Sequence, residues 1–109
     1  MSGIDSPLEI DLVLQGPDGE FVLMIADTRP VSGLPADIRL LREKIHTYVA
    51  FALDGELVRE FPDAAGRPVV VHFDYSTAPG PAVMGALDQL ALSVEAHGLT
   101  LVWGRPGPD

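Results

Sequence analysis

The chain has 109 residues, 47% of them hydrophobic, and it carries 16 acidic residues against seven Lys and Arg, for a formal net charge of −9. This length and apolar content predict one folded domain over residues 1–109, with residues 1–6 and 104–109 frayed. Nucleic-acid binding depends on cations that neutralise phosphates, so the charge argues against it and against anionic membrane surfaces. Because there is no cysteine, disulfides, thiolate metal sites and cysteine nucleophiles are excluded.

The N-terminal residues after Met1 resemble neither a signal peptide nor a transit peptide. No apolar run approaches the ~20 residues that span a bilayer. We therefore expect a cytoplasmic protein. Ala, Gly, Pro, Val, Asp and Arg are abundant and Lys44 is the only lysine, which suggests a bacterial genome rich in GC.

The first predicted elements form a β-hairpin. Residues 8–15 alternate, which is typical of a half-buried strand, and residues 20–26 form a second strand after the turn sequence Gly16-Pro17-Asp18-Gly19. With a four-residue loop, the apolar side chains of both strands share one face. The predicted pairs are Leu14 with Phe21, Leu12 with Leu23, and Ile10 with Ile25.

A long amphipathic helix is predicted within residues 34–55. Apolar residues at helical spacing form its buried stripe: Ile38, Leu41, Ile45, Tyr48, Val49 and Ala52. Pro35 suits the first turn, and Asp54-Gly55 is a typical stop. Leu40 and Phe51 lie on one flank of this stripe, so we expect the segment after Gly55 to fold back over them.

The second half of the chain contains a strand, a helix and a last strand. In residues 68–75, Val69, Val71 and Phe73 share one face, while Val70, His72 and Asp74 share the other. A helix runs from Pro81 to about His97, and residues 99–103 form the last strand. The order ββαβαβ predicts a two-layer α/β (α+β) sandwich, in which a mixed four-stranded sheet carries both helices on one face.

Several of these segments resemble a family of small bacterial proteins that is classed as a domain of unknown function. The resemblance lies in the strand Ile10-Asp11-Leu12-Val13, its return Leu23-Met24-Ile25-Ala26-Asp27, the helix from Leu41 to Phe51, Pro62, and the strand Val69-Val70-Val71. Most of these positions are core positions. The resemblance therefore supports the fold and implies no catalytic residue.

Catalytic motifs are absent from the sequence: there is no Gly-x-Ser-x-Gly, no phosphate-binding loop with its Lys, and no His-Glu-x-x-His. One weak metal or acid–base candidate is a group of polar residues that we place on the sheet face opposite the helices, namely Glu9, Asp11, His72 and Asp74. The alternative is a solvated face. We expect no cofactor. We also expect a binding protein rather than an enzyme.

The same face carries more apolar residues than a solvated face needs, and such patches often mark interfaces. The interface candidates are Val13, Val22, Met24, Val70 and Val102, with Leu92 on the back of the second helix. The preferred interpretation is a non-catalytic protein-interaction module that forms a homodimer or holds a protein partner. Two alternatives stay open: a small metal-dependent enzyme or ligand binder, and an acidic inhibitor or immunity-like protein for a basic partner.

Overall fold

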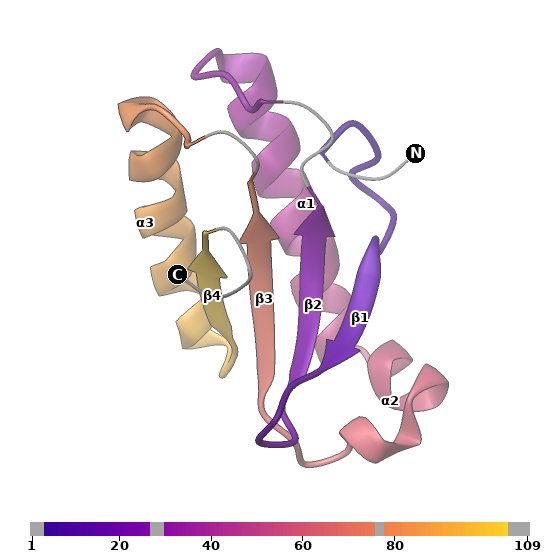
Figure 1. Cartoon of the computed structure of the whole chain (residues 1–109). Helices are drawn as coiled ribbons and strands as arrows, with labels where there is room; N and C mark the ends of the chain where they lie inside the picture. The colour runs from indigo at the N-terminus through magenta and orange to yellow at the C-terminus, as the bar shows by residue number, and fades with distance from the viewer. Residues whose placement is uncertain (1–3, 27–29, 76–77, 105–109) are drawn as a thin grey trace.

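A mixed four-stranded sheet and two long helices form two layers in the computed structural model, which describes residues 4–26, 30–75 and 78–104 (Figure 1). The strands lie in the order β1-β2-β3-β4, where β1 is antiparallel to β2 and the other neighbours are parallel. Their bounds are Leu12–Gln15 (β1), Phe21–Ala26 (β2), Val69–Asp74 (β3) and Thr100–Trp103 (β4). The predicted ββαβαβ sandwich is thereby confirmed.

The two long helices, α1 (Pro35–Leu53) and α3 (Pro81–Ala96), cover the same face of the sheet (Figure 1). Pro35 occupies the first turn of α1, and Gly55, with a φ of +87°, follows its end. Positive φ is accessible to glycine at little steric cost, which explains the stop. The predicted helix and its end are thus confirmed.

A short helix that the sequence did not predict, α2 (Glu56–Glu60), follows α1 and leads into a 3₁₀ turn, η1 (Pro62–Ala64). Leu57 of α2 is 1% exposed and joins the same core cluster as Phe51. The segment after Gly55 therefore folds back beside Phe51, as expected, while its expected position over Leu40 stays a prediction.

The core lies between the sheet and the two long helices. Leu23, Ile25, Val71 and Phe73 are fully buried on the sheet side, and they face the fully buried Leu41, Ile45 and Leu87 of the helices. The predicted face assignment is therefore confirmed for β2 and β3. Among the residues that the structure describes, no helix covers the opposite face of the sheet (Figure 1).

The predicted register of the hairpin is wrong by one residue. Leu12 pairs with Met24, Val13 with Leu23 and Leu14 with Val22. Because side chains alternate along a strand, this shift exchanges the two faces of β1. Val13 packs on the core, whereas Leu12 and Leu14 are 45% and 42% exposed on the open face.

The shifted register is closed by a tighter turn than predicted. The Gly16 amide donates to the Glu20 carbonyl oxygen at 2.7 Å, which leaves a three-residue loop over residues 17–19. Gly19 takes the left-handed conformation that such a loop needs, with a φ of +84°. Strand β1 also begins later than predicted, at Leu12 instead of Leu8. The side chain of Leu8 is 83% exposed.

The N-terminal segment packs more tightly than expected. Ile4 is only 3% exposed and belongs to the core cluster, so residues 4–6 are not frayed. Residues 1–3 and 105–109, also expected to fray, lie outside the described residues, as does Asp27 of the family resemblance.

The register predicts that one added charge lowers the stability by very different amounts at two adjacent positions. Val13→Asp places a carboxylate against the core and should lower the free energy of unfolding by about 2–4 kcal/mol. Leu14→Asp points away from the core and should cost less than about 1 kcal/mol. Urea denaturation measures both. Equal destabilisation, or a larger loss at Leu14, would contradict the observed register.

Candidate functional site

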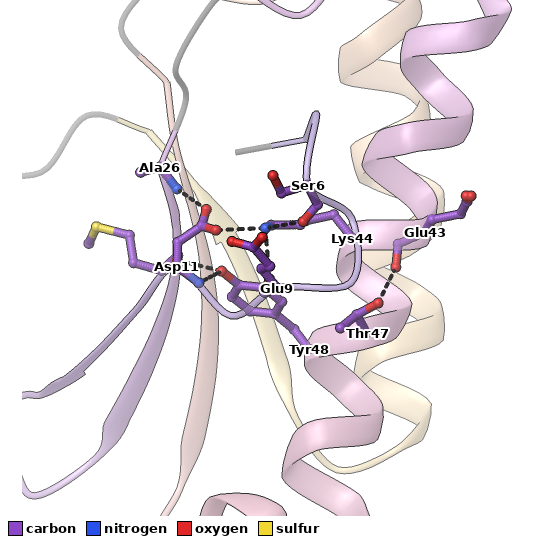
Figure 2. Close-up of polar contacts among 9 residues, drawn as sticks. Ser6, Glu9, Asp11, Ala26, Glu43, Lys44, Thr47 and Tyr48 are labelled. Carbon is purple, nitrogen blue, oxygen red and sulfur yellow. Dashed lines mark hydrogen bonds and ion pairs between the residues drawn. The ribbon is translucent and has the colours of Figure 1, made fainter. Parts of the chain in front are cut away.

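The only lysine of the chain is fully buried at the end of the sheet where β1 begins (Figure 2). Lys44 reaches from α1 towards the N-terminal segment and Asp11. Its Nζ donates to the carbonyl oxygens of Ser6 and Glu9 at 2.8 and 2.7 Å, and to Asp11 Oδ1 at 2.6 Å. An ammonium group has three N–H donors, so all three have acceptors.

Asp11 joins this lysine to both strands of the hairpin. Its side chain is 2% exposed, and its Oδ2 accepts a hydrogen bond from the Ala26 amide at 3.0 Å. The Asp11 amide donates to the Tyr48 hydroxyl at 2.8 Å, and that hydroxyl donates to the Met24 carbonyl oxygen at 2.8 Å (Figure 2). The cluster therefore ties the start of β1 to α1 and to the end of β2.

This cluster is suited to holding the fold together, and its geometry does not suit catalysis. Lys44 and Tyr48 are both 0% exposed, and their polar atoms are occupied by partners within the chain. Burial is the main cause that raises the pKa of the Tyr48 hydroxyl well above its usual value of 10.0. Neither group can therefore meet or activate a substrate in this arrangement.

The four polar candidates of the predicted metal or acid–base site do not come together. Asp11 lies on the helix side with Lys44, whereas His72 and Asp74 lie on the open face of β3. The prediction that they share a face is wrong, because the register of β1 is shifted. Within residues 4–26, 30–75 and 78–104, no group of three or more His, Asp or Glu side chains could hold a metal ion.

His72 has a partner of its own. Its Nε2 lies 3.1 Å from the Gly104 carbonyl oxygen. Because a carbonyl oxygen only accepts, this nitrogen carries the proton. The contact ties the end of β4 to β3, which gives His72 a structural role.

The open face of the sheet is mainly apolar. The register aligns two rows of side chains across the four strands, Leu14-Val22-Val70-Thr100 and Leu12-Met24-His72-Val102. Sequence reasoning included Val13 and missed Leu12 and Leu14. The signal that reveals the error is Lys44, which lies between Leu41 and Tyr48 on the apolar stripe of α1 and needs a facing carboxylate.

Leu92 lies on the other layer. It belongs to α3 and is 71% exposed, away from the residues that α3 buries. A groove of about 360 Å³, which Leu92 does not line, runs between the second halves of α1 and α3, with His46 and His97 among its lining residues. His97 Nδ1 lies 2.8 Å from the Ser93 carbonyl oxygen, so this histidine closes the last turn of α3. Among the described residues, no helix is both long and apolar enough to cross a membrane.

The buried ion pair predicts a large and coupled loss of stability. Lys44→Met leaves the Asp11 carboxylate buried without its cation and should lower the free energy of unfolding by about 3–5 kcal/mol. The double variant Asp11→Asn with Lys44→Met should recover part of this loss. Arg42→Met, at an exposed position of α1, is the matched control and should leave the urea midpoint unchanged. An unaltered midpoint for Lys44→Met would contradict the structural role of the cluster.

The raised pKa of Tyr48 predicts how stability depends on alkaline pH. Above pH 10 the unfolded chain releases the tyrosine proton while the folded chain retains it, so unfolding becomes easier. The contribution of this hydroxyl to the free energy of unfolding is complete below pH 10. It is lost as the pH rises towards the pKa of Tyr48 in the folded chain. Tyr48→Phe removes two hydrogen bonds, at a cost of about 1–2 kcal/mol near neutral pH. The difference in free energy of unfolding between wild type and Tyr48→Phe, measured by urea titration, should then narrow above pH 10. A difference that stays constant with pH would contradict this prediction.

Three comparisons with known proteins give one match, to a family model. A comparison with curated proteins found no match, and neither did one with solved structures. A family model does match, over residues 1–106, and it is described as a family of unknown function (DUF6572). Because the match covers nearly the full sequence, the chain belongs to the family of unknown function DUF6572.

Proposed function

We propose that this protein is a non-catalytic interaction module that associates with a second copy of itself through the open sheet face. The observation that carries the proposal is the apolar character of that face. Leu12, Leu14 and Val102 are 45%, 42% and 39% exposed there, next to the partly exposed Val22 and Val70. Apolar side chains that are contiguous and exposed are typical of interaction sites.

The distribution of charge favours a second copy as the occupant of this face. The chain has a net charge of −9, yet Asp74 is the only charged residue that strands β1 to β4 place on the open face. Two such faces can therefore meet with their charged surfaces directed outwards. An isologous contact of this kind needs only that the patch be complementary to itself.

The size of the face sets the expected strength of the contact. With strands ~4.8 Å apart and ~6.6 Å between successive residues on one face, the two rows cover roughly 250 Å². A specific interface of standard size buries about 800 Å² on each partner. We therefore expect a weak dimer that depends on concentration, and no obligate dimer.

Two substitutions in the centre of the face test the proposal. Val22→Glu and Val70→Glu should each abolish the dimer, because each buries a carboxylate in the contact. Both side chains point away from the core, so the monomer should stay folded by circular dichroism. Sedimentation velocity from about 5 to 500 µM, a range suited to a weak interface, measures the oligomeric state.

Leu92→Glu is the matched control. It makes the same kind of change at an exposed apolar residue of the helical layer, and it should leave the dimer intact. A wild-type protein that is monomeric at every concentration, or a Val22→Glu variant that still dimerises, would overturn the proposal. If only Leu92→Glu abolished the dimer, the interface would lie on α3, and this result would also overturn the proposal.

A further inference from the structure

We infer that the free edge of β1 and the groove beside α2 bind an extended basic segment of a partner protein, which adds a strand to the sheet. This surface is distinct from the open face, and it would give the protein a partner other than a second copy. The inference combines three observations: unpaired backbone groups on β1, an apolar groove along them, and carboxylates that line the groove.

Strand β1 is an edge strand, because in the described part of the chain it pairs with β2 and with no other strand. The Gly16 amide bonds to Glu20 across the hairpin, and hydrogen-bonded pairs alternate with non-bonded pairs in an antiparallel ladder. Leu14 and Leu12 therefore direct their amides and carbonyls towards β2. Val13 and Gln15 direct theirs outwards, where an added strand would find donors and acceptors at the correct spacing.

Two hollows run along this edge, with volumes of about 330 and 440 Å³. They share Val13, Glu60 and Phe61, so they form one continuous groove between β1 and the α2–η1 segment. Phe51 lines one hollow, and Phe61, 36% exposed, lines both and leans on Phe21 at 6.2 Å between ring centroids. The apolar side of the groove is therefore aromatic and held in place. Figure 1 shows α2 beside the lower end of β1.

The charge of the groove selects the chemistry of its occupant. Glu56, Glu60 and Asp63 line it, all three are exposed, and no Lys or Arg is among the described residues that line it. Within the part of the chain that the structure describes, none of the three carboxylates forms an ion pair. A lysine in the groove would lay its apolar stem over Phe61 and bring its ammonium group to Glu60.

The same geometry disfavours a second copy at this edge. Pairing β1 with β1 of another molecule would bring two sets of these carboxylates towards each other, and like charges are repelled in a partly desolvated interface. Residues 10–15 line the groove, so it accommodates a segment of about six residues at ~3.3 Å per residue. Alternate side chains of that segment would point to the groove and to the open face beside Leu12 and Leu14. Lysine or arginine alternating with an apolar residue fits both sides.

A labelled hexapeptide tests the inference, with Lys-Val repeated three times and both ends blocked. Fluorescence anisotropy should detect binding that weakens at least about fivefold when the salt is raised from about 20 to 200 mM, because the carboxylates are exposed. The Glu-Val repeat should not bind. A Lys-Val peptide with alternate amides methylated keeps its charge but cannot complete the ladder, so it should bind at least about tenfold more weakly.

Variants of the protein locate the site. Glu60→Gln should weaken binding about threefold or more, whereas Glu95→Gln on α3 removes the same charge elsewhere and should have little effect. Gln15→Pro removes an outward amide at an edge position where proline is tolerated, and it should weaken binding relative to Gln15→Ala. Val22→Glu should keep the peptide site, so failure of the dimer and failure of this inference are distinguishable.

Three results would overturn the inference. One is no detectable binding of the Lys-Val peptide. Another is equal binding of the methylated peptide, which would indicate charge attraction without an added strand. The third is an equal loss of peptide affinity in Glu60→Gln and Glu95→Gln, which would indicate attraction by the net charge of the protein and no binding in a defined groove.

Discussion

The buried ion pair between Lys44 and Asp11 is the constraint on which the rest of the structure depends. A lysine that is 0% exposed keeps its charge only if its donors are satisfied, and here one carboxylate and two carbonyl oxygens do so. The three acceptors come from residues 6–11. The lysine on α1 therefore holds the chain that enters β1, and Tyr48, one turn further along, holds the Asp11 amide.

This constraint determines which side chains β1 presents to solvent. Asp11 must face the helices, so Val13 also faces them, and Leu12 and Leu14 must face away. The opposite phase would bury both leucines, at a gain of about 1.5–3 kcal/mol for each leucine that is fully buried, but it would leave Lys44 without its carboxylate. Losing one partner of a buried pair costs about 3–5 kcal/mol, which is comparable in size. The apolar open face is thus a consequence of an ionic requirement on the other side of the sheet.

The sequence was sufficient to predict the elements whose patterns are unambiguous. The stripe of α1, the buried stripe of α3 and the alternation of β3 each leave one way to bury the apolar residues. Strand β1 is different, because it has apolar residues in both phases: Leu12 and Leu14, in line with Ile10 before the strand, in one phase, and Val13 in the other. The pattern of β1 alone favours burial of the leucines and so predicts the wrong register. The buried Lys44 on the stripe of α1 needs a facing carboxylate, and this requirement selects the opposite phase. Helix α2 was missed since five residues contain too little periodicity to identify a helix.

The two proposed surfaces both depend on β1, but on different parts of it. The side chains of Leu12 and Leu14 belong to the open face, while the outward backbone of Val13 and Gln15 belongs to the edge groove. A sheet face recognises shape and apolar area, whereas a sheet edge recognises an extended backbone and, here, positive charge. A dimer through the face leaves the edge of each copy exposed, so the two contacts are geometrically compatible. The Lys44–Asp11 pair sets the position and phase of β1, and one buried interaction therefore determines the geometry of both surfaces.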